Sequence, residues 1–184
     1  MGGSMERQAF LVMDVQQGIV EQFGGTGAYL DRIRDAIQKA RTAGIPVFFV
    51  RVGFRPGYPE VNLNNRSFRA IREREGPLGE VHPGLHLKPD DIVVTKKRVS
   101  AFAGSDLDML LRAAGVTRLV LAGIATSGVV LSTVRDGADR DYALTVLQDG
   151  CLDGDPEVQR VLMEKVFPRQ ADVTSISSWG ESLS

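Results

Sequence analysis

Continuous apolar runs of strand length alternate with amphipathic segments along the first third of the chain. Gln8–Val15 is such a run and contains a carboxylate, Asp14, near its end, and Val47–Val52 is a second run. Between them, Tyr29–Ala43 places apolar residues three or four positions apart and is followed by Gly44, which is typical of an amphipathic helix and its C-terminal stop. This succession predicts a parallel βαβ unit.

The same alternation continues to the end of the chain and defines the fold class. We predict an α/β protein, a three-layer Rossmann-like sandwich around a mostly parallel sheet of about six strands. One domain over residues 1–184 is sufficient at this length. The further strands are expected at Asp91–Lys97, Arg118–Ile124, Tyr142–Leu147 and Ala171–Ile176, and the further helices at Ser105–Ala114, Gly128–Arg140 and Asp155–Val166.

One long segment, Gly53–Asp90, interrupts this regularity. It is rich in Gly and Pro, carries four arginines between Arg55 and Arg72, and has room for one short helix. Long irregular segments in compact domains are usually functional, so we expect this excursion to contribute to a pocket or to subunit contact, with a featureless surface segment as the alternative.

Composition narrows the possible partners. The 22 basic and 23 acidic residues give a net charge of −1, which does not build the basic surface that nucleic acid or an anionic membrane requires. No apolar run approaches the ~20 residues that span a bilayer. A single cysteine and two histidines argue against a disulfide and a transition-metal site, and favour the cytoplasm. The opening Met1–Ser4 has the composition of a tag remnant and is left out of the fold argument.

Three polar positions fall at predicted strand ends. Asp14 and Lys96 each follow or end a strand, and the Gly123–Val129 turn follows another. Ligands of parallel sheets bind at the carboxyl ends of the strands, so these positions should converge on one cleft. Taken singly, each has a structural explanation: a turn-forming Asp, a solvated Lys and a helix cap.

The segments around these positions resemble three motifs of the isochorismatase-like hydrolases, in order and spacing. They are Leu11–Gln16, Thr95–Asp108 and Val120–Cys151. The resemblance implies that Asp14 and Lys96 match the aspartate and lysine of the family's Asp–Lys–Cys triad, with Lys97 as the less favoured neighbour. It also implies a small-molecule substrate, no cofactor, a homodimer or larger oligomer, and a cis peptide bond at Ile124–Ala125.

The chain departs from the cysteine members of that family at the nucleophile. The position that matches the cysteine is Val129, and the single thiol, Cys151, lies in a different loop. The nearby hydroxyls of Ser127, Ser132 and Thr133 have no histidine close in sequence to activate them. By analogy with isochorismatases, which also lack the cysteine, Asp14 would act as a general acid and Lys96 would orient the substrate. The alternatives are a non-catalytic, ligand-binding oligomer and an unexpected nucleophile.

The expected substrate contacts come from the same motifs and from the excursion. The Arg51–Glu60 segment has no Asp or His, so the metal site of nicotinamidases is not expected. Arg55 and Arg66 are further candidates for an anionic substrate, with exposed arginine as the simpler reading, and Phe54, Tyr58 and Trp179 would line a pocket or fill the core. The residues we select as substrate-binding are Phe102, Ala125, Thr126, Val129 and Arg51.

Overall fold

A single six-stranded sheet organises the computed structural model, which describes residues 6–25, 27–74 and 76–183. Every pairing between its named strands is parallel, which confirms the predicted sheet and makes it fully rather than mostly parallel. Residues 1–4, interpreted above as a tag remnant, lie outside the described residues. In spatial order the strands are β3 (Ile92–Lys96), β2 (Val47–Val52), β1 (Gln8–Met13), β4 (Arg118–Ile124), β5 (Ala143–Leu152) and β6 (Asp172–Thr174).

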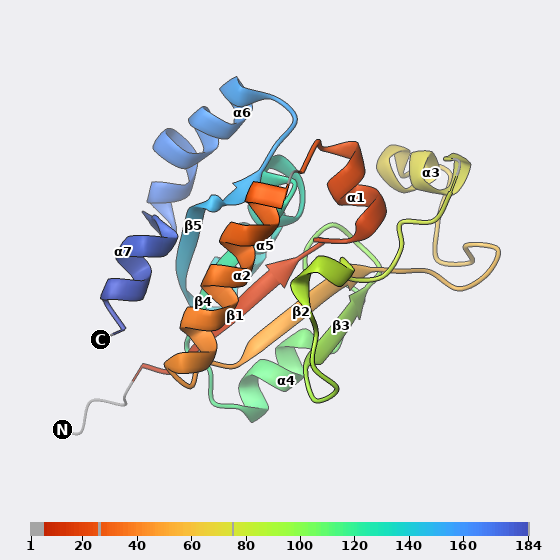
Figure 1. Cartoon of the computed structure of the whole chain (residues 1–184). Coiled ribbons are helices and arrows are strands. Elements are labelled where there is room, and N and C mark those ends of the chain that lie inside the picture. Colours follow the sequence, from red (N-terminus) through yellow and green to blue (C-terminus); the bar gives the residue numbers. More distant parts are fainter. Residues whose placement is uncertain (1–5, 26, 75, 184) are drawn as a thin grey trace.

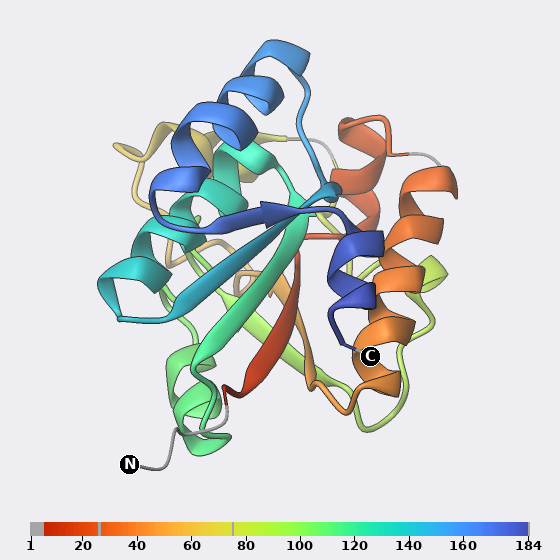
Figure 2. The ribbon, with the colours of Figure 1, turned by 90° about the vertical axis from the view of Figure 1, so that its left-hand side faces the viewer.

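Helices cover both faces of this sheet, so the predicted three-layer sandwich is confirmed (Figures 1 and 2). One face is covered by α1 (Gln17–Gln22), α2 (Gly27–Thr42) and α7 (Ile176–Glu181). The other is covered by α4 (Leu107–Ala113), α5 (Leu131–Asp139) and α6 (Pro156–Val161), which continues as a π-helical turn over Leu162–Val166.

The central position of β1 follows from its composition. Leu11 and Met13 face one core, Phe10 and Val12 face the other, and all four side chains are buried. A strand that is apolar on both faces is stable only where helices cover both sides, which is the middle of a parallel sheet. The carboxyl end of β1 is thereby fixed between the ends of β2 and β4.

The Gly53–Asp90 excursion forms two short helical segments rather than one. They are α3 (Arg66–Glu73), capped by the Asn65 side chain, and a 3₁₀ turn at Pro83–Leu85. The buried Phe68 and Leu85 side chains attach these segments to the core on the α2 face. The excursion is therefore packed on the domain: its α3 part lies beside the carboxyl ends of the strands, and the rest returns to the start of β3 (Figure 1).

Some strands begin and end at the residues predicted from the sequence, and others differ from the prediction. The strands at Val47–Val52 and Arg118–Ile124 have the predicted bounds, whereas β5 runs past Leu147 to Leu152 after a register shift against β4. The short helices α1 and α7 were not predicted. Among the described residues, no helix is long and apolar enough to cross a membrane.

Candidate active site

A cavity of about 370 Å³ opens at the carboxyl ends of the central strands. Its polar floor is formed by Asp14, directly after β1, and Lys96, at the end of β3. The remaining walls come from α1, the excursion, the ends of β2 and β4, and the segments after β3 and β4. They are Ile19, Gln22, Phe23, Val52, Ser67, Phe68, Ala70, Ile71, Arg74, Leu78, Val99, Ile124, Ala125, Gly128 and Val129.

Asp14 and Lys96 form a buried ion pair. The Lys96 Nζ lies 3.1 Å from the Asp14 Oδ2, and the two residues are 1% and 7% exposed, respectively. Lys96 also donates a hydrogen bond to the Arg98 carbonyl oxygen at 2.8 Å, which fixes its ammonium at the floor of the cavity. Asp14 adopts a left-handed backbone conformation (φ 56°), which Asp tolerates better than most residues. The sheet edge therefore holds both charges in one place.

Burial changes the acidity of the Asp14 carboxyl. Loss of solvation raises its pKa from 3.8 to about 6, and the charge and hydrogen bond of Lys96 oppose that rise without cancelling it. The second oxygen, Oδ1, is buried and has no hydrogen-bond partner within the described part of the chain. Asp14 therefore exchanges a proton near neutral pH and has one oxygen without a bonding partner.

The alternation of β3 decides between the two neighbouring lysines. Lys96 lines the cavity, whereas the Lys97 side chain lies on the other face of the strand. There Lys97 donates to the Gly53 carbonyl oxygen at 2.5 Å, and its Nζ lies 3.8 Å from Glu60 Oε1. Lys96 is thus the lysine that the geometry joins to Asp14.

The turn after β4 forms the wall opposite Lys96. Gly123 lies so close to β1 that a Cβ atom there would be 2.2 Å from the Met13 carbonyl oxygen. The Ile124–Ala125 peptide bond is cis, as predicted. A π-helical turn over Thr126–Val130 follows, and Ala125 and Val129 both line the cavity.

Comparison with known proteins assigns this arrangement to a family. An isochorismatase domain model matches residues 8–178. The chain belongs to the isochorismatase family. It is 36% identical over 174 residues to the ureidoacrylate amidohydrolase RutB of Methylobacterium radiotolerans, covering 80% of this chain and 67% of that protein.

Solved structures agree with this assignment. A cysteine hydrolase from Pseudomonas syringae pv. phaseolicola superposes with a TM-score of 0.86 at 26% identity, covering 96% of this chain and 92% of that one. N-carbamoylsarcosine amidase from Thermoplasma acidophilum gives a TM-score of 0.71 at 26% identity, covering 92% and 96% of the two chains.

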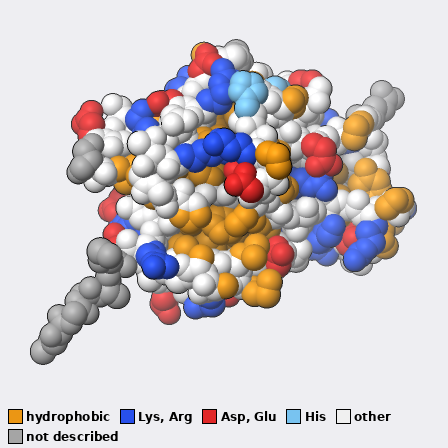
Figure 3. Space-filling view, turned by 60° about the horizontal axis from the view of Figure 1, so that its bottom comes forward, with side chains coloured by type: hydrophobic (Ala, Val, Ile, Leu, Met, Phe, Trp, Pro, Cys, Tyr) orange, Lys and Arg blue, Asp and Glu red, His pale blue; other side chains and the backbone are white. Residues whose placement is uncertain are grey.

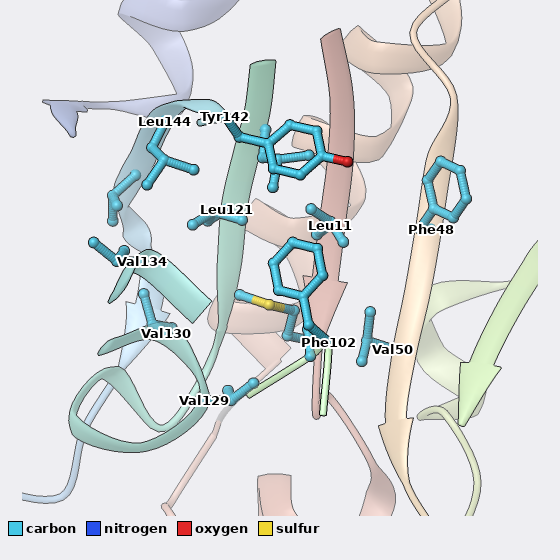
Figure 4. Packing of buried hydrophobic residues seen from close by; sticks show 14 of the residues in the cluster. Leu11, Phe48, Val50, Phe102, Leu121, Val129, Val130, Val134, Tyr142 and Leu144 are labelled. Carbon is cyan, nitrogen blue, oxygen red and sulfur yellow. The ribbon is translucent and has the colours of Figure 1, made fainter. Parts of the chain in front are cut away.

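Three of the residues selected as substrate-binding do not line the cavity. Phe102 lies in the core, where its ring stacks on Tyr142 with centroids 5.9 Å apart (Figure 4). Thr126 is fully buried and donates to Gln159 Oε1 at 2.5 Å. Arg51 pairs with Glu80 and donates to Thr95 Oγ1 at 3.0 Å. The partners that these side chains find in the fold account for their positions away from the cavity.

The alternative nucleophiles lie away from the cavity. Cys151 lies in the extension of β5, paired with Gly123, and not in a loop as expected; it is buried, and burial raises the pKa of its thiol to about 12. Thr133 Oγ1 accepts a hydrogen bond from the Ala101 backbone at 3.0 Å, and Ser127 is exposed with its backbone N–H bonded to Asp153. None of these side chains is among the residues that line the cavity.

The remaining candidates from the sequence divide between the surface and the core. Arg66 is exposed, and the largely exposed Arg55 pairs with Glu60 at 2.9 Å. Phe54 packs against Tyr58 and Phe68, and Trp179 packs against Phe10. The structure describes no group of three or more His, Cys, Asp or Glu side chains that could hold a metal ion.

Several polar residues at the site were not selected from the sequence. Arg74, after α3, lines the cavity, as do Gln22 and Ser67. The buried Gln16 amide bonds to both backbone groups of Val52, at 2.8 and 3.0 Å, and donates to the Gly79 carbonyl oxygen at 2.8 Å. Gln16 is the last residue of the first motif, so that motif offered a signal for it. Arg74 lies in the excursion, where no periodicity distinguishes it from the other arginines.

A larger hollow lies at the opposite end of the sheet. It measures about 650 Å³ and is bordered by Arg7, Pro46, Val116 and Leu183 near the amino ends of the strands. Figure 3 brings that end of the molecule forward and shows hydrophobic side chains gathered between charged ones. Ligands of parallel α/β sheets bind at the carboxyl ends, where the buried Asp14–Lys96 pair also lies, so chemistry rather than size identifies the candidate site.

Proposed function

We propose that this isochorismatase-family chain is a small-molecule hydrolase that uses Asp14 as a general acid and base, without a covalent nucleophile. The observation that supports this most directly is the buried ion pair between Asp14 and Lys96 on the floor of an open cavity. A strongly perturbed carboxyl beside a specific cation in a cleft is typical of catalytic sites.

In the proposed reaction, protonated Asp14 donates its proton to the leaving group as the bond between that group and the electrophilic carbon breaks. A water molecule forms the new C–O bond and returns one proton to the Asp14 carboxylate, so the acid is regenerated. Lys96 balances the charge of the carboxylate between these steps. With a pKa raised to about 6, Asp14 has both forms available near neutral pH.

Val129 is the reason for proposing a mechanism without a covalent intermediate. It lines the cavity at the position that we match to the family's cysteine, and an aliphatic side chain cannot attack a carbonyl. The relatives named above as an amidohydrolase and an amidase favour C–N bonds of amides or carbamoyl groups as the substrate class.

A substrate screen tests the proposal. Purified protein is incubated with amides, N-carbamoyl compounds and vinyl ethers, with Asp14→Asn as the matched blank. We expect turnover of at least one class and a loss of about 10²- to 10⁴-fold in the blank, the usual contribution of general acid–base catalysis. Equal rates for both proteins would refute the role of Asp14. No turnover of any class would favour a non-catalytic binding protein.

The pH dependence gives an independent test. A general acid must be protonated in the free enzyme, so kcat/KM should fall about tenfold per pH unit above a value near 6. A profile that instead rises through pH 6 would mean that Asp14 enters the reaction as the carboxylate, and the assigned order of proton transfers would be wrong.

Two wider predictions accompany this proposal. We propose that the chain forms a homodimer or larger oligomer, with the excursion at or near the contact between subunits, and that it acts in the cytoplasm. Light scattering at micromolar concentration measures the oligomeric state directly. A monomer at that concentration would refute the proposed oligomer.

A further inference from the structure

The charges that line the cavity do not balance. Three charged residues are present: Asp14, Lys96 and Arg74. In its carboxylate form Asp14 neutralises Lys96, whose Nζ lies 3.1 Å from Asp14 Oδ2. Arg74 makes no ion pair with any described residue and therefore leaves the lining with one excess positive charge.

One nitrogen of the Arg74 guanidinium has no hydrogen-bond acceptor among the described residues. This nitrogen, Nη1, is buried. The group is packed beside α1, because a Cβ added to Gly18 would lie 3.4 Å from this nitrogen and 2.8 Å from the Pro77 carbonyl oxygen. Leaving a buried donor unpaired costs about 1–3 kcal/mol, so an arriving acceptor gains an unusually favourable site.

Other arginines around the site are satisfied by the protein itself. Arg51 pairs with Glu80, and Arg98 donates to the Lys97 and Glu60 carbonyl oxygens at 2.6 and 3.0 Å. Arg74 thus differs from Arg51 and Arg98 in having a buried guanidinium nitrogen with no hydrogen-bond partner among the residues that the structure describes.

We propose that Arg74 is the specificity residue for the carboxylate of an anionic substrate; this inference rests on the function proposed above. The planar guanidinium presents paired N–H donors that match the two oxygens of a carboxylate. The walls between Arg74 and the Asp14–Lys96 floor are largely apolar, with Phe23, Phe68 and Ile71 among them. The substrate is therefore a small amide or carbamoyl compound with a short apolar stem and a carboxylate at its far end.

A binding experiment without turnover tests carboxylate recognition by itself. Butyrate and 2-pentanone have similar shapes, differ in charge and contain no hydrolysable bond. Titrations followed by protein NMR should show that the wild-type protein prefers butyrate. Arg74→Gln should raise the Kd for butyrate roughly 10- to 100-fold and leave 2-pentanone within about twofold.

Two further variants control this result. Arg72→Gln removes an equal charge from an exposed position on α3 and should bind both compounds as the wild type does. Arg74→Lys keeps the charge and should retain part of the preference for butyrate, which separates recognition from misfolding. Unchanged butyrate binding in Arg74→Gln, or an equal loss of both compounds in Arg74→Gln and Arg74→Lys, would overturn the proposal. Equal binding of butyrate and methyl phosphate would overturn the carboxylate assignment.

Hydrolysis of succinamate and succinamide separates this inference from the proposed function. If the chain is a hydrolase and Arg74 recognises the carboxylate, the wild type has a higher kcat/KM for succinamate than for succinamide, and Arg74→Gln removes that difference. Arg74-dependent butyrate binding in a protein that hydrolyses nothing would refute hydrolysis and preserve carboxylate recognition. Turnover of succinamide and succinamate at equal rates, unaffected by Arg74→Gln, would support hydrolysis and refute carboxylate recognition by Arg74.

Discussion

Replacing Lys96 by Met isolates the electrostatic contribution of the buried pair. Met has nearly the length of Lys and removes only its charge and hydrogen bonds. Asp14 then remains 7% exposed, with neither of its oxygens near a cation. Because Lys96 holds the pKa of Asp14 below the value that burial alone would impose, the substitution should raise that pKa above its present value of about 6.

The sign and size of the effect follow from proton linkage. Asp14 ionises near 3.8 in the unfolded chain and near 6 in the folded one, so the free energy of unfolding contributed by this group falls between those pH values. In Lys96→Met the fall continues to higher pH, at about 1.4 kcal/mol per unit of further pKa rise. Breaking a buried ion pair on one side costs about 3–5 kcal/mol in all, which we expect at pH 8.

At pH 5 the Asp14 carboxyl is largely protonated in both proteins, so this cost disappears. What remains is the hydrogen bond from Lys96 to the Arg98 carbonyl oxygen, worth about 1 kcal/mol. The substitution should therefore destabilise the fold three to five times more at pH 8 than at pH 5.

Urea unfolding between pH 5 and 8, followed by the fluorescence of Trp179, the single tryptophan, measures this dependence. Lys97→Met is the matched control. Its ammonium is partly exposed and lies 3.8 Å from Glu60, whose pKa is lowered below the tested range, so a loss under about 1 kcal/mol that does not vary with pH is expected. A loss for Lys96→Met that is equal at pH 5 and pH 8 would refute the reasoning.

Three further substitutions test the rest of the site. Cys151→Ala should leave turnover within about twofold and lower stability by about 1–2 kcal/mol through lost packing; abolished turnover would contradict the proposed mechanism. Val129→Cys, made in that background, should add one thiol that iodoacetamide alkylates at pH 7, as detected by mass spectrometry, because Val129 and Lys96 line the same cavity; a protein that stays unlabelled would contradict this prediction. Gly123→Ala should destabilise the fold by about 3 kcal/mol or more, since its Cβ would meet the Met13 carbonyl oxygen at 2.2 Å, whereas Gly27→Ala in α2 has open space and should be neutral in thermal unfolding.

The parts of the fold that the sequence predicted are those where burial leaves a periodic record. β2 and β4 are runs of mostly buried apolar residues, and β2 is bounded by Pro46 and Gly53, residue types that interrupt a strand. α1 has six residues and no side-chain cap, which is too short for a helical period to emerge. The extension of β5 to Leu152 depends on a register shift against β4, which is a property of two strands together rather than of one segment.

The site was predicted to the extent that it depends on strand ends. Asp14, Lys96 and the turn containing Ala125 and Val129 occupy the carboxyl edge because parallel strands must end there. The direction of a side chain within a motif is a different matter. Phe102 shares its motif with Lys96, yet it turns into the core and stacks on Tyr142, a residue about forty positions away in the chain. Motif spacing contains no information about such a partner.

The same reasoning explains why Arg74 could not be selected from the sequence. Whether an arginine is available to a substrate depends on whether the fold supplies it with an acceptor, and Glu80 supplies one to Arg51, whereas no described residue does so for Arg74. In the proposed mechanism the sheet edge provides the reacting groups, and the excursion provides the group that selects the substrate. Because the excursion can change in sequence without moving Asp14 or Lys96, family members with the same sheet edge should differ in substrate charge according to what occupies the position of Arg74.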